Sequence, residues 1–232
     1  MNKKLLCLLM FVFSLGLTFT ACSSDDDDPV NLTLEKSESS VDQGATVTVK
    51  ITQGNGDYKV SSASETTATA SVSGDVITIT GVAAGETTIT VTDKDKKTAT
   101  LKVMVVGYAE QIAATYKGQL SVKLGENPAI PQENVEIILG TTENKAKVSL
   151  LNFSFDTLVL GDIVVDNIPV KEVDGTITLE PTTAKVSLLG GAIEADVTVQ
   201  GTVKDGNLIL DIDVPAIPMV GDIKVAFDGD KI

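Results

Sequence analysis

The sequence predicts an all-β protein, a β-sandwich followed by an antiparallel β-barrel. Threonine and valine alternate in many short stretches, for example Thr46–Thr52, and this two-residue period is typical of a strand with one buried face. Residues that favour turns separate these stretches about every 8 to 12 positions. Only one short stretch beyond the N-terminal leader has helical character. Strands joined by short turns therefore account for nearly the whole chain.

The first 21 residues have the organisation of an export signal. Lys3 and Lys4 precede the apolar run Leu5–Phe19, and the small pair Thr20-Ala21 stands directly before Cys22. The apolar run is shorter than the roughly 20 residues that a transmembrane helix needs. This order resembles the lipobox of bacterial lipoproteins, which implies that residues 1–21 are removed and that Cys22 is diacylated, with palmitate among its chains. A plain signal peptide that happens to end in cysteine is the alternative.

Residues 22–29 join this signal to the folded part. Directly after Cys22 come two serines and four aspartates: Ser23, Ser24, Asp25, Asp26, Asp27 and Asp28. In one interpretation they form a solvated tether whose charges keep the folded part away from an anionic membrane. The run also resembles the export tag that sends some lipoproteins of diderm bacteria to the outer face of the outer membrane. We therefore expect a protein that is held in the cell outer membrane by acyl chains and faces the cell exterior.

The composition excludes several kinds of chemistry. Without residues 1–21 the chain has 16 basic and 32 acidic residues, so its net charge of about −16 opposes binding to nucleic acid. It has no His and no Arg, and its cysteines are Cys7 and Cys22. Catalytic triads that need His, thiol nucleophiles and zinc sites built on His or Cys therefore cannot be assembled in the mature chain. Catalysis by two carboxylates stays formally open, but we expect no enzyme, no cofactor and no metal.

Residues 30–106 are predicted to form the sandwich, with about seven strands. The clearest strands are Thr46–Thr52, Val76–Thr80, Thr88–Thr92 and Ala99–Val105. Alternation places Val47, Val49 and Ile51 on one face of the first of these strands, and Leu101, Val103 and Val105 inward on the last. Turn residues at 54–57, 73–75, 84–85 and 93–95 separate the strands.

Four stretches of this segment carry a resemblance to a known family: Leu32–Leu34, Val41–Gly44, Gly54–Tyr58 and Ile77–Thr92. They are similar to bacterial immunoglobulin-like domains, and the strand, glycine-bearing loop and strand of Ile77–Thr92 match best. The resemblance implies an immunoglobulin-like β-sandwich without the disulfide and core tryptophan of antibody domains. Such domains serve as stalks or adhesive modules.

Residues 107–114 are expected to connect the two domains. Gly107 marks the boundary, and Tyr108–Ala114 is rich in Ala, Glu and Gln, with Tyr108 and Ile112 one helical turn apart. This pattern predicts a short helix. It could be a connector packed on the next domain or a lid over one end of a barrel, and the connector is the simpler interpretation.

Residues 115–232 are predicted to form the second domain from around ten strands. The expected strands are Tyr116–Val122, Val135–Leu139, Lys145–Phe153, Leu158–Val165, Ile168–Val173, Thr176–Leu179, Ala184–Leu188, Ala195–Val203, Asn207–Val214 and Asp222–Phe227. The prolines should lie in loops, at strand ends or on edges: Pro128, Pro131, Pro169, Pro181, Pro215 and Pro218. So many strands without a helix favour a closed antiparallel barrel, which leaves no edge strand.

The second segment carries a resemblance of its own, on Tyr116–Leu120, Leu150–Phe155, Leu160–Val170, Gly201–Leu208 and Ile223–Gly229. These stretches are similar to the calycin-like β-barrel domain of bacterial surface lipoproteins. The resemblance implies a calycin-like β-barrel and brings no catalytic motif with it. The Gly-x-Trp signature of lipocalins is missing, so ligand binding does not follow from the fold.

One candidate site is an apolar pocket inside the barrel. Tyr116, Phe153 and Phe155 could line such a pocket and hold a small apolar ligand. However, small barrels are usually filled by their own side chains, so core packing is the default interpretation.

Two further candidates are pairs of aspartates. Asp211 and Asp213 point to one face of a strand and could hold Ca²⁺, although alternating aspartates more often mark a solvent face. Asp93 and Asp95, with their lysine neighbours, could contact a cation or a partner. A solvated hairpin turn is the simpler interpretation of that second pair.

We expect a non-enzymatic binding or adhesion module with the sandwich as its spacer and an extracellular protein or glycan as its partner. A carrier of a small apolar ligand in the barrel is the first alternative, and a structural component of the envelope is the second. A lined cavity would favour the carrier, whereas a filled barrel with an exposed patch would favour a protein partner.

Overall fold

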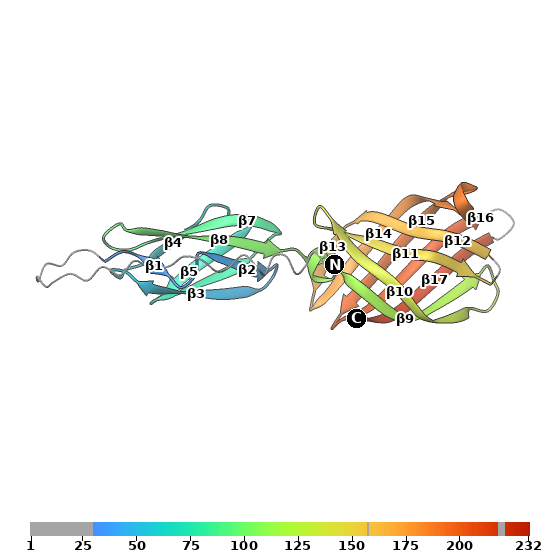
Figure 1. Cartoon of the computed structure of the whole chain (residues 1–232), viewed down its shortest axis with the longest axis horizontal. Coiled ribbons are helices and arrows are strands. Elements are labelled where there is room, and N and C mark those ends of the chain that lie inside the picture. The colour runs from blue at the N-terminus through green and yellow to red at the C-terminus, as the bar shows by residue number, and fades with distance from the viewer. Residues whose placement is uncertain (1–29, 157, 218–220) are drawn as a thin grey trace, which may run out of the picture.

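A computed structural model describes residues 30–156, 158–217 and 221–232 of the chain (Figure 1). These residues form two β domains that lie end to end and are joined by a short connector. The predicted signal peptide and tether, residues 1–29, lie outside the described residues.

The N-terminal domain is a sandwich of two four-stranded sheets, with orders β1-β3-β6-β5 and β2-β8-β7-β4. The strands are β1 (Thr33–Leu34), β2 (Glu38–Asp42), β3 (Thr46–Gln53), β4 (Lys59–Ser62), β5 (Ala68–Ser73), β6 (Val76–Gly81), β7 (Gly85–Thr92) and β8 (Thr98–Val106). There are eight strands instead of about seven, because the first edge segment changes sheets between β1 and β2. β2 then pairs with β8 in parallel.

The core of this domain lies between the two sheets. Val49 and Ile51 of β3 are buried and Val47 packs against the same cluster, as the alternation predicted. Leu101, Val103 and Val105 of β8 are also buried, which confirms the second predicted face.

The connector contains helix α1 (Tyr108–Gln111), which begins after Gly107. The predicted helix up to Ala114 is too long, because Ala114 is already the first residue of β9 and pairs with Leu139. Ile112 is 3% exposed and belongs to the core of the second domain. The chain therefore passes from α1 into the barrel within two residues, Ile112 and Ala113.

The second domain is one antiparallel sheet of nine strands, in the order β12-β11-β10-β9-β17-β16-β15-β14-β13. The strands are β9 (Ala114–Leu124), β10 (Ile130–Thr142), β11 (Lys145–Phe155), β12 (Leu158–Ile168), β13 (Val170–Val173), β14 (Thr176–Leu188), β15 (Ile193–Lys204), β16 (Asn207–Ile217) and β17 (Gly221–Lys231), with the 3₁₀ turn η2 (Leu189–Gly191) after β14. Two of the strands expected from the sequence are parts of one strand, β14.

Pro181 lies within β14, beyond the residues Thr176–Leu179 that pair with β13, so it lies on an edge of the sheet as predicted. The pairing of β14 with β15 is irregular between Leu179 and Thr182, and Pro181 sits in that interval. A bulge of this kind tolerates proline because no ladder hydrogen bond needs its missing N–H group.

The barrel is nearly closed. β12 and β13 are the two ends of the sheet, but only Pro169 separates them in sequence, so they run on like one bent strand. The N–H of Glu180 donates to the carbonyl oxygen of Pro169 at 2.9 Å, and beyond this bond β12 lies beside β14. Among the described residues no ladder joins β12 to β14. The predicted antiparallel barrel is therefore confirmed, and it is nearly closed: along this seam the described residues of β12 and β14 lie side by side without a ladder.

Apolar side chains fill the barrel. Residues at 0% exposure come from most of its long strands: Leu120, Ile137, Val148, Ile163, Leu188, Val197 and Leu210. These side chains belong to one hydrophobic cluster that extends over the strands of the barrel. The interior is a packed core, as is usual for a small barrel.

Candidate functional site

The three aromatic residues predicted to line a pocket are all part of the barrel core. Tyr116 is 0% exposed, Phe153 3% and Phe155 5%. Tyr116 lies near the start of β9, at the connector end of the barrel, whereas Phe153 and Phe155 lie where β11 approaches its turn into β12. The three rings help to fill one continuous core, which agrees with the default interpretation of core packing.

Tyr116 has a structural partner. Its hydroxyl donates a hydrogen bond to the carbonyl oxygen of Ile112 at 2.8 Å, directly after helix α1. Burial raises the pKa of Tyr116 above its ordinary value, because the ionised phenolate would lose its hydration. This residue therefore ties the connector to the first strand of the barrel.

In the barrel core, the polar group found among the described side chains is the hydroxyl of Tyr116, which is bonded to Ile112. The other buried polar or charged side chains among the described residues are Thr87 and Asp93, and both belong to the N-terminal domain. A pair of enclosed carboxylates, which would be needed for acid–base catalysis without histidine, is therefore not found among the described residues of the barrel.

Asp211 and Asp213 lie on the outer face of β16, as the solvent-face interpretation predicted. Asp213 stands opposite Lys224 of β17, and Asp211 stands opposite Ala226. Within the part of the chain that the structure describes, no three metal-ligating side chains gather into a group that could hold an ion. The neighbouring lysine leaves this pair poorly suited to Ca²⁺, which prefers several oxygen ligands.

Asp93 is not a solvated turn residue as the sequence suggested; it is 4% exposed. Its Oδ2 accepts hydrogen bonds from the side-chain amide of Asn55 at 2.7 Å and the backbone N–H of Asn55 at 3.2 Å. Its Oδ1 accepts from the backbone N–H groups of Asp95 at 3.0 Å and Lys97 at 2.9 Å. Burial raises the pKa of Asp93, but the hydrogen bonds from Asn55, Lys97 and Asp95 outweigh it and lower that pKa overall.

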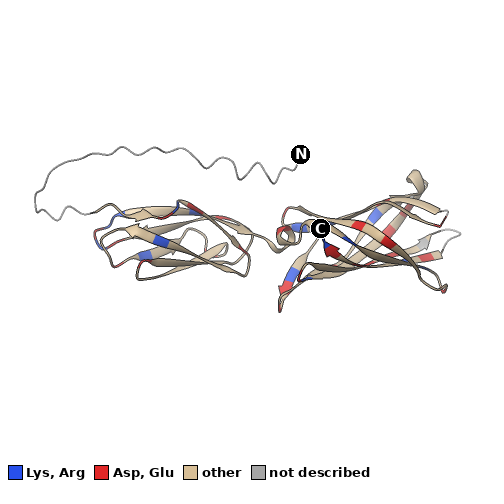
Figure 2. Cartoon of the chain, turned by 60° about the horizontal axis from the view of Figure 1, so that its bottom comes forward, with Lys and Arg blue, Asp and Glu red and all other residues tan. Residues whose placement is uncertain are grey.

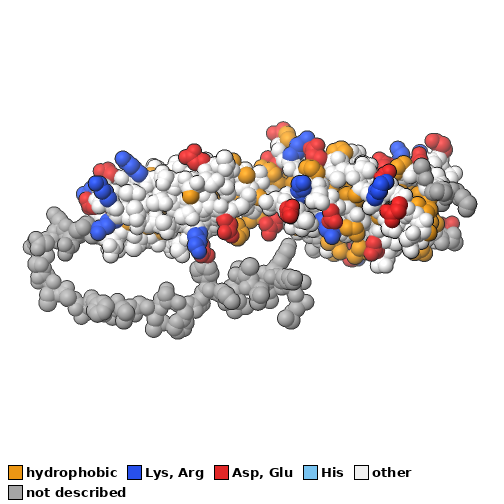
Figure 3. All heavy atoms as spheres, turned by 90° about the horizontal axis from the view of Figure 1, so that it is seen from above, with side chains coloured by type: hydrophobic (Ala, Val, Ile, Leu, Met, Phe, Trp, Pro, Cys, Tyr) orange, Lys and Arg blue, Asp and Glu red, His pale blue; other side chains and the backbone are white. Residues whose placement is uncertain are grey.

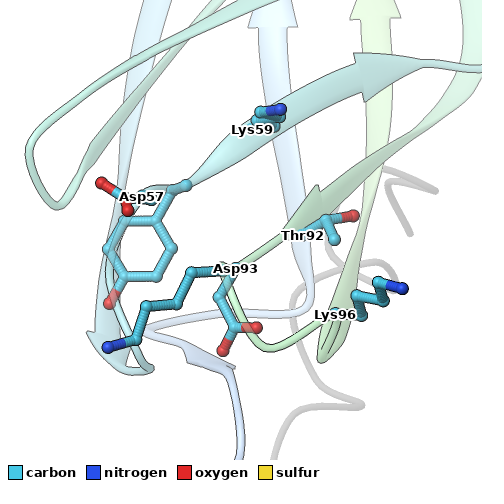
Figure 4. Close-up of a pocket in the computed structure, with 7 residues that line it drawn as sticks. Asp57, Lys59, Thr92, Asp93 and Lys96 are labelled. Atoms are coloured by element: carbon cyan, nitrogen blue, oxygen red, sulfur yellow. The ribbon is translucent and has the colours of Figure 1, made fainter.

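These hydrogen bonds connect the loops at the end of the N-terminal domain where the described residues begin. The side chain of Asn55 also exchanges two hydrogen bonds with the backbone of Val30. A hollow of about 680 Å³ lies at this tip and is lined by Asp57, Tyr58, Lys59, Thr92, Asp93, Lys94 and Lys96 (Figure 4). The sequence identifies Asp93 as a turn residue, because aspartate commonly begins a turn. It does not identify Asn55 as the hydrogen-bond partner of Asp93, because the two residues are distant in sequence.

A second hollow, of about 800 Å³, lies on the outer face of β2, β8 and β7. It is lined by Glu38, Ser39, Ser40, Glu86, Thr87, Thr88, Lys102, Val103 and Met104. Met104 is 50% exposed and stands between Ser40 and Glu86 in the sheet register. The sequence pattern did not single out this face, because alternation separates inward from outward side chains and does not identify a hollow among the outward ones.

The outside of the barrel carries most of the exposed apolar groups. Figure 3 shows hydrophobic atoms gathered on the barrel, whereas the visible face of the N-terminal domain is mainly polar. The exposed apolar residues of the barrel strands are Ile130, Ile138, Leu151, Val159, Val173 and Ile209. Acidic and basic residues occur along the strands of both domains (Figure 2). Exposed apolar residues of the barrel thus lie on its outer surface, among the acidic and basic residues there.

The predicted attachment and tag residues, Cys22 to Asp28, lie outside the described residues. Among the residues that are described, none of the helices has the length and the apolar character to cross a membrane.

Comparison with known families agrees with this geometry. The bacterial Ig-like domain family (group 2) matches residues 28–103, and the calycin-like β-barrel domain family matches residues 112–230. Both kinds of domain are typically non-catalytic binding folds. Comparison with curated proteins found no match. The two family matches coincide with the two domains of the fold, and the second spans more than half of the sequence, so the chain belongs to the calycin-like β-barrel domain family and carries a bacterial Ig-like domain before its barrel.

Proposed function

We propose that this protein is a lipid-anchored, non-enzymatic binding or adhesion module displayed on the outer face of the outer membrane. Cys22 would carry the acyl chains, and the Ig-like domain would act as a spacer that holds the barrel away from the membrane. The partner would be an extracellular protein or a glycan.

The observation that carries this proposal is the packed apolar interior of the barrel. A calycin-like barrel can carry a ligand only where the interior of the barrel has a cavity that can hold the ligand. Here the aromatic residues and the aliphatic residues of the strands occupy that space themselves. Recognition must then use the outer surface, where exposed apolar and charged side chains lie next to each other.

The charge of the mature chain supports a display role. An excess of acidic residues keeps a protein soluble beside an anionic membrane and works against nonspecific contact with it. The absence of His and Arg removes the commonest general base and the forked phosphate or carboxylate clamp. Both facts favour a binding role over a catalytic one.

The test compares cells that produce the full chain with cells that produce Cys22→Ala. We expect the wild-type protein in the membrane fraction and open to external protease, and the variant released from the membrane. Cells with the wild-type protein should adhere to immobilised matrix proteins or to a glycan array, and the variant cells should not. Equal adhesion would contradict the adhesion function, and unchanged membrane retention would contradict the anchor.

Native mass spectrometry distinguishes the proposed surface recognition from the alternative of a ligand carrier. The protein is purified from its own host without detergent. A clean polypeptide mass is the expected result. A discrete extra mass that disappears on extraction with organic solvent would identify a carried ligand and would overturn the proposal of recognition by the outer surface.

A further inference from the structure

The connector contacts the Ig-like domain through Gly107, Tyr108 and Gln111. The side-chain amide of Gln111 donates to the carbonyl oxygens of Val106, at 3.1 Å, and of Gln43, at 3.5 Å. A Cβ atom at Gly107 would lie 2.8 Å from the Cβ of Ala84, so this glycine allows α1 to approach the loop before β7. The helix therefore does not hang freely from the end of β8.

Tyr108 makes a second contact with the Ig-like domain. A Cβ atom at Gly44 would lie 2.9 Å from the hydroxyl oxygen of Tyr108 and 3.7 Å from Cζ of its ring. Gly44 itself has a φ of +84°, a conformation that suits glycine. The ring thus rests against the turn between β2 and β3.

The other side of the connector is fixed to the barrel. Ile112 is part of the barrel core, and Ala109 is 0% exposed. The backbone oxygen of Gln111 accepts a hydrogen bond from Nζ of Lys231 at 3.5 Å. α1 also lies against β10, β11 and β13, and the side-chain oxygen of Asn144 would be 3.8 Å from a Cβ at Gly107.

From these contacts we propose that α1 is a rigid joint that makes the two domains move as one body. Domains joined within one chain ordinarily move relative to each other unless their contact is extensive. Here the connecting segment outside regular structure is reduced to Gly107 on one side and Ile112-Ala113 on the other. Gly107 lies against Ala84, Ile112 belongs to the barrel core, and the N–H of Ala113 donates to the carbonyl oxygen of Glu110 at 3.2 Å. A rigid joint holds the end of the barrel opposite α1 at a fixed position relative to the Ig-like domain.

Spin-label distance measurements test this joint. Labels at Lys50→Cys in the Ig-like domain and Lys224→Cys in the barrel suit the purpose, because both sites are exposed and the chain has no cysteine after Cys22. The protein is taken from Ser23 to Ile232, which retains both domains and the joint. We expect one narrow distance distribution, and a broad distribution in this protein would overturn the proposal.

A matched pair of variants shows whether the Tyr108 contact maintains the joint. Gly44→Ala adds a methyl group against the Tyr108 hydroxyl, and Gly56→Ala adds one at nearly the same φ, +81°, with nothing within 4 Å. We expect Gly44→Ala to broaden the distribution, because the two domains then move relative to each other, and Gly56→Ala to leave it unchanged.

The double variant Gly44→Ala with Tyr108→Phe should restore the narrow distribution, because the closest remaining ring atom would lie 3.7 Å from the new methyl group. Circular dichroism of each variant controls for loss of the fold. If Gly56→Ala broadened the distribution as much as Gly44→Ala, or if removal of the hydroxyl failed to rescue it, the contact would not set the joint.

Discussion

Replacing Tyr116 by Phe removes one hydrogen bond from an otherwise unchanged core. The ring is 0% exposed and its hydroxyl donates to the Ile112 oxygen at 2.8 Å, so the variant leaves a carbonyl acceptor without this partner. A net loss of about 1–2 kcal/mol in the free energy of unfolding follows from one buried hydrogen bond and the acceptor that it leaves unpaired. For a domain of this size that corresponds to a fall in Tm of roughly 3–8 °C.

Tyr116→Ala gives the upper bound for this position. Loss of the whole buried ring should cost about 3–5 kcal/mol, since the packed interior cannot close fully around the space. Urea unfolding followed by circular dichroism measures both variants, with Tyr58→Phe in the other domain as the control. Tyr116→Phe as stable as the wild-type protein would refute the structural role of the hydroxyl.

The same residue predicts how the barrel responds to alkaline pH. Burial raises the pKa of Tyr116 in the folded state, so its contribution is fully present below the unfolded pKa near 10 and is lost as the pH rises toward the folded value. Stability should therefore fall above about pH 10 in the wild-type protein, and less steeply in Tyr116→Phe. Identical slopes in the two proteins would contradict burial as the cause.

Three further predictions concern other parts of the chain. Asp93→Ala should destabilise the Ig-like domain more than Asp95→Ala does, as measured by thermal unfolding. Because the pKa of Asp93 is lowered in the folded state, its contribution to stability is present above the unfolded pKa near 3.8 and is lost as the pH falls through the folded pKa. Gly118→Ala should destabilise the barrel severely, since its Cβ would lie 2.0 Å from a backbone oxygen of β17, whereas Gly140→Ala, whose nearest atom is 4.0 Å away, should be tolerated in the same melting assay. Replacing Asp25–Asp28 with Ser and Ala should leave the protein in the membrane but hide it from external protease, and unchanged cleavage would reduce the acidic run to a tether.

The sequence predicted the features that depend on neighbouring residues. Alternation has a period of two residues, so it identified the strands and the buried faces of β3 and β8. The absence of His and Arg, and of any cysteine after Cys22, is a property of composition. It excluded catalytic triads that need His, thiol nucleophiles and zinc sites built on His or Cys without any knowledge of the structure.

The sequence could not predict features that join distant segments. The helix after Gly107 is short because Ala114 pairs with Leu139, and a pattern within the connector does not contain that information. Asp93 is buried and accepts a hydrogen bond from Asn55, which is distant in sequence. The seam lies between β12 and β14, two strands that are not consecutive in the chain.

By itself, then, the sequence predicted two successive β domains and most of their strands, and it predicts an export signal with its cysteine. Only the tertiary structure decided that the barrel is filled instead of hollow, that it stays open along one seam, and that α1 is bonded to both domains. The physical reason is range. Side-chain alternation and turn chemistry act over a few residues, whereas packing, ladder closure and burial of polar groups depend on partners that the fold brings together.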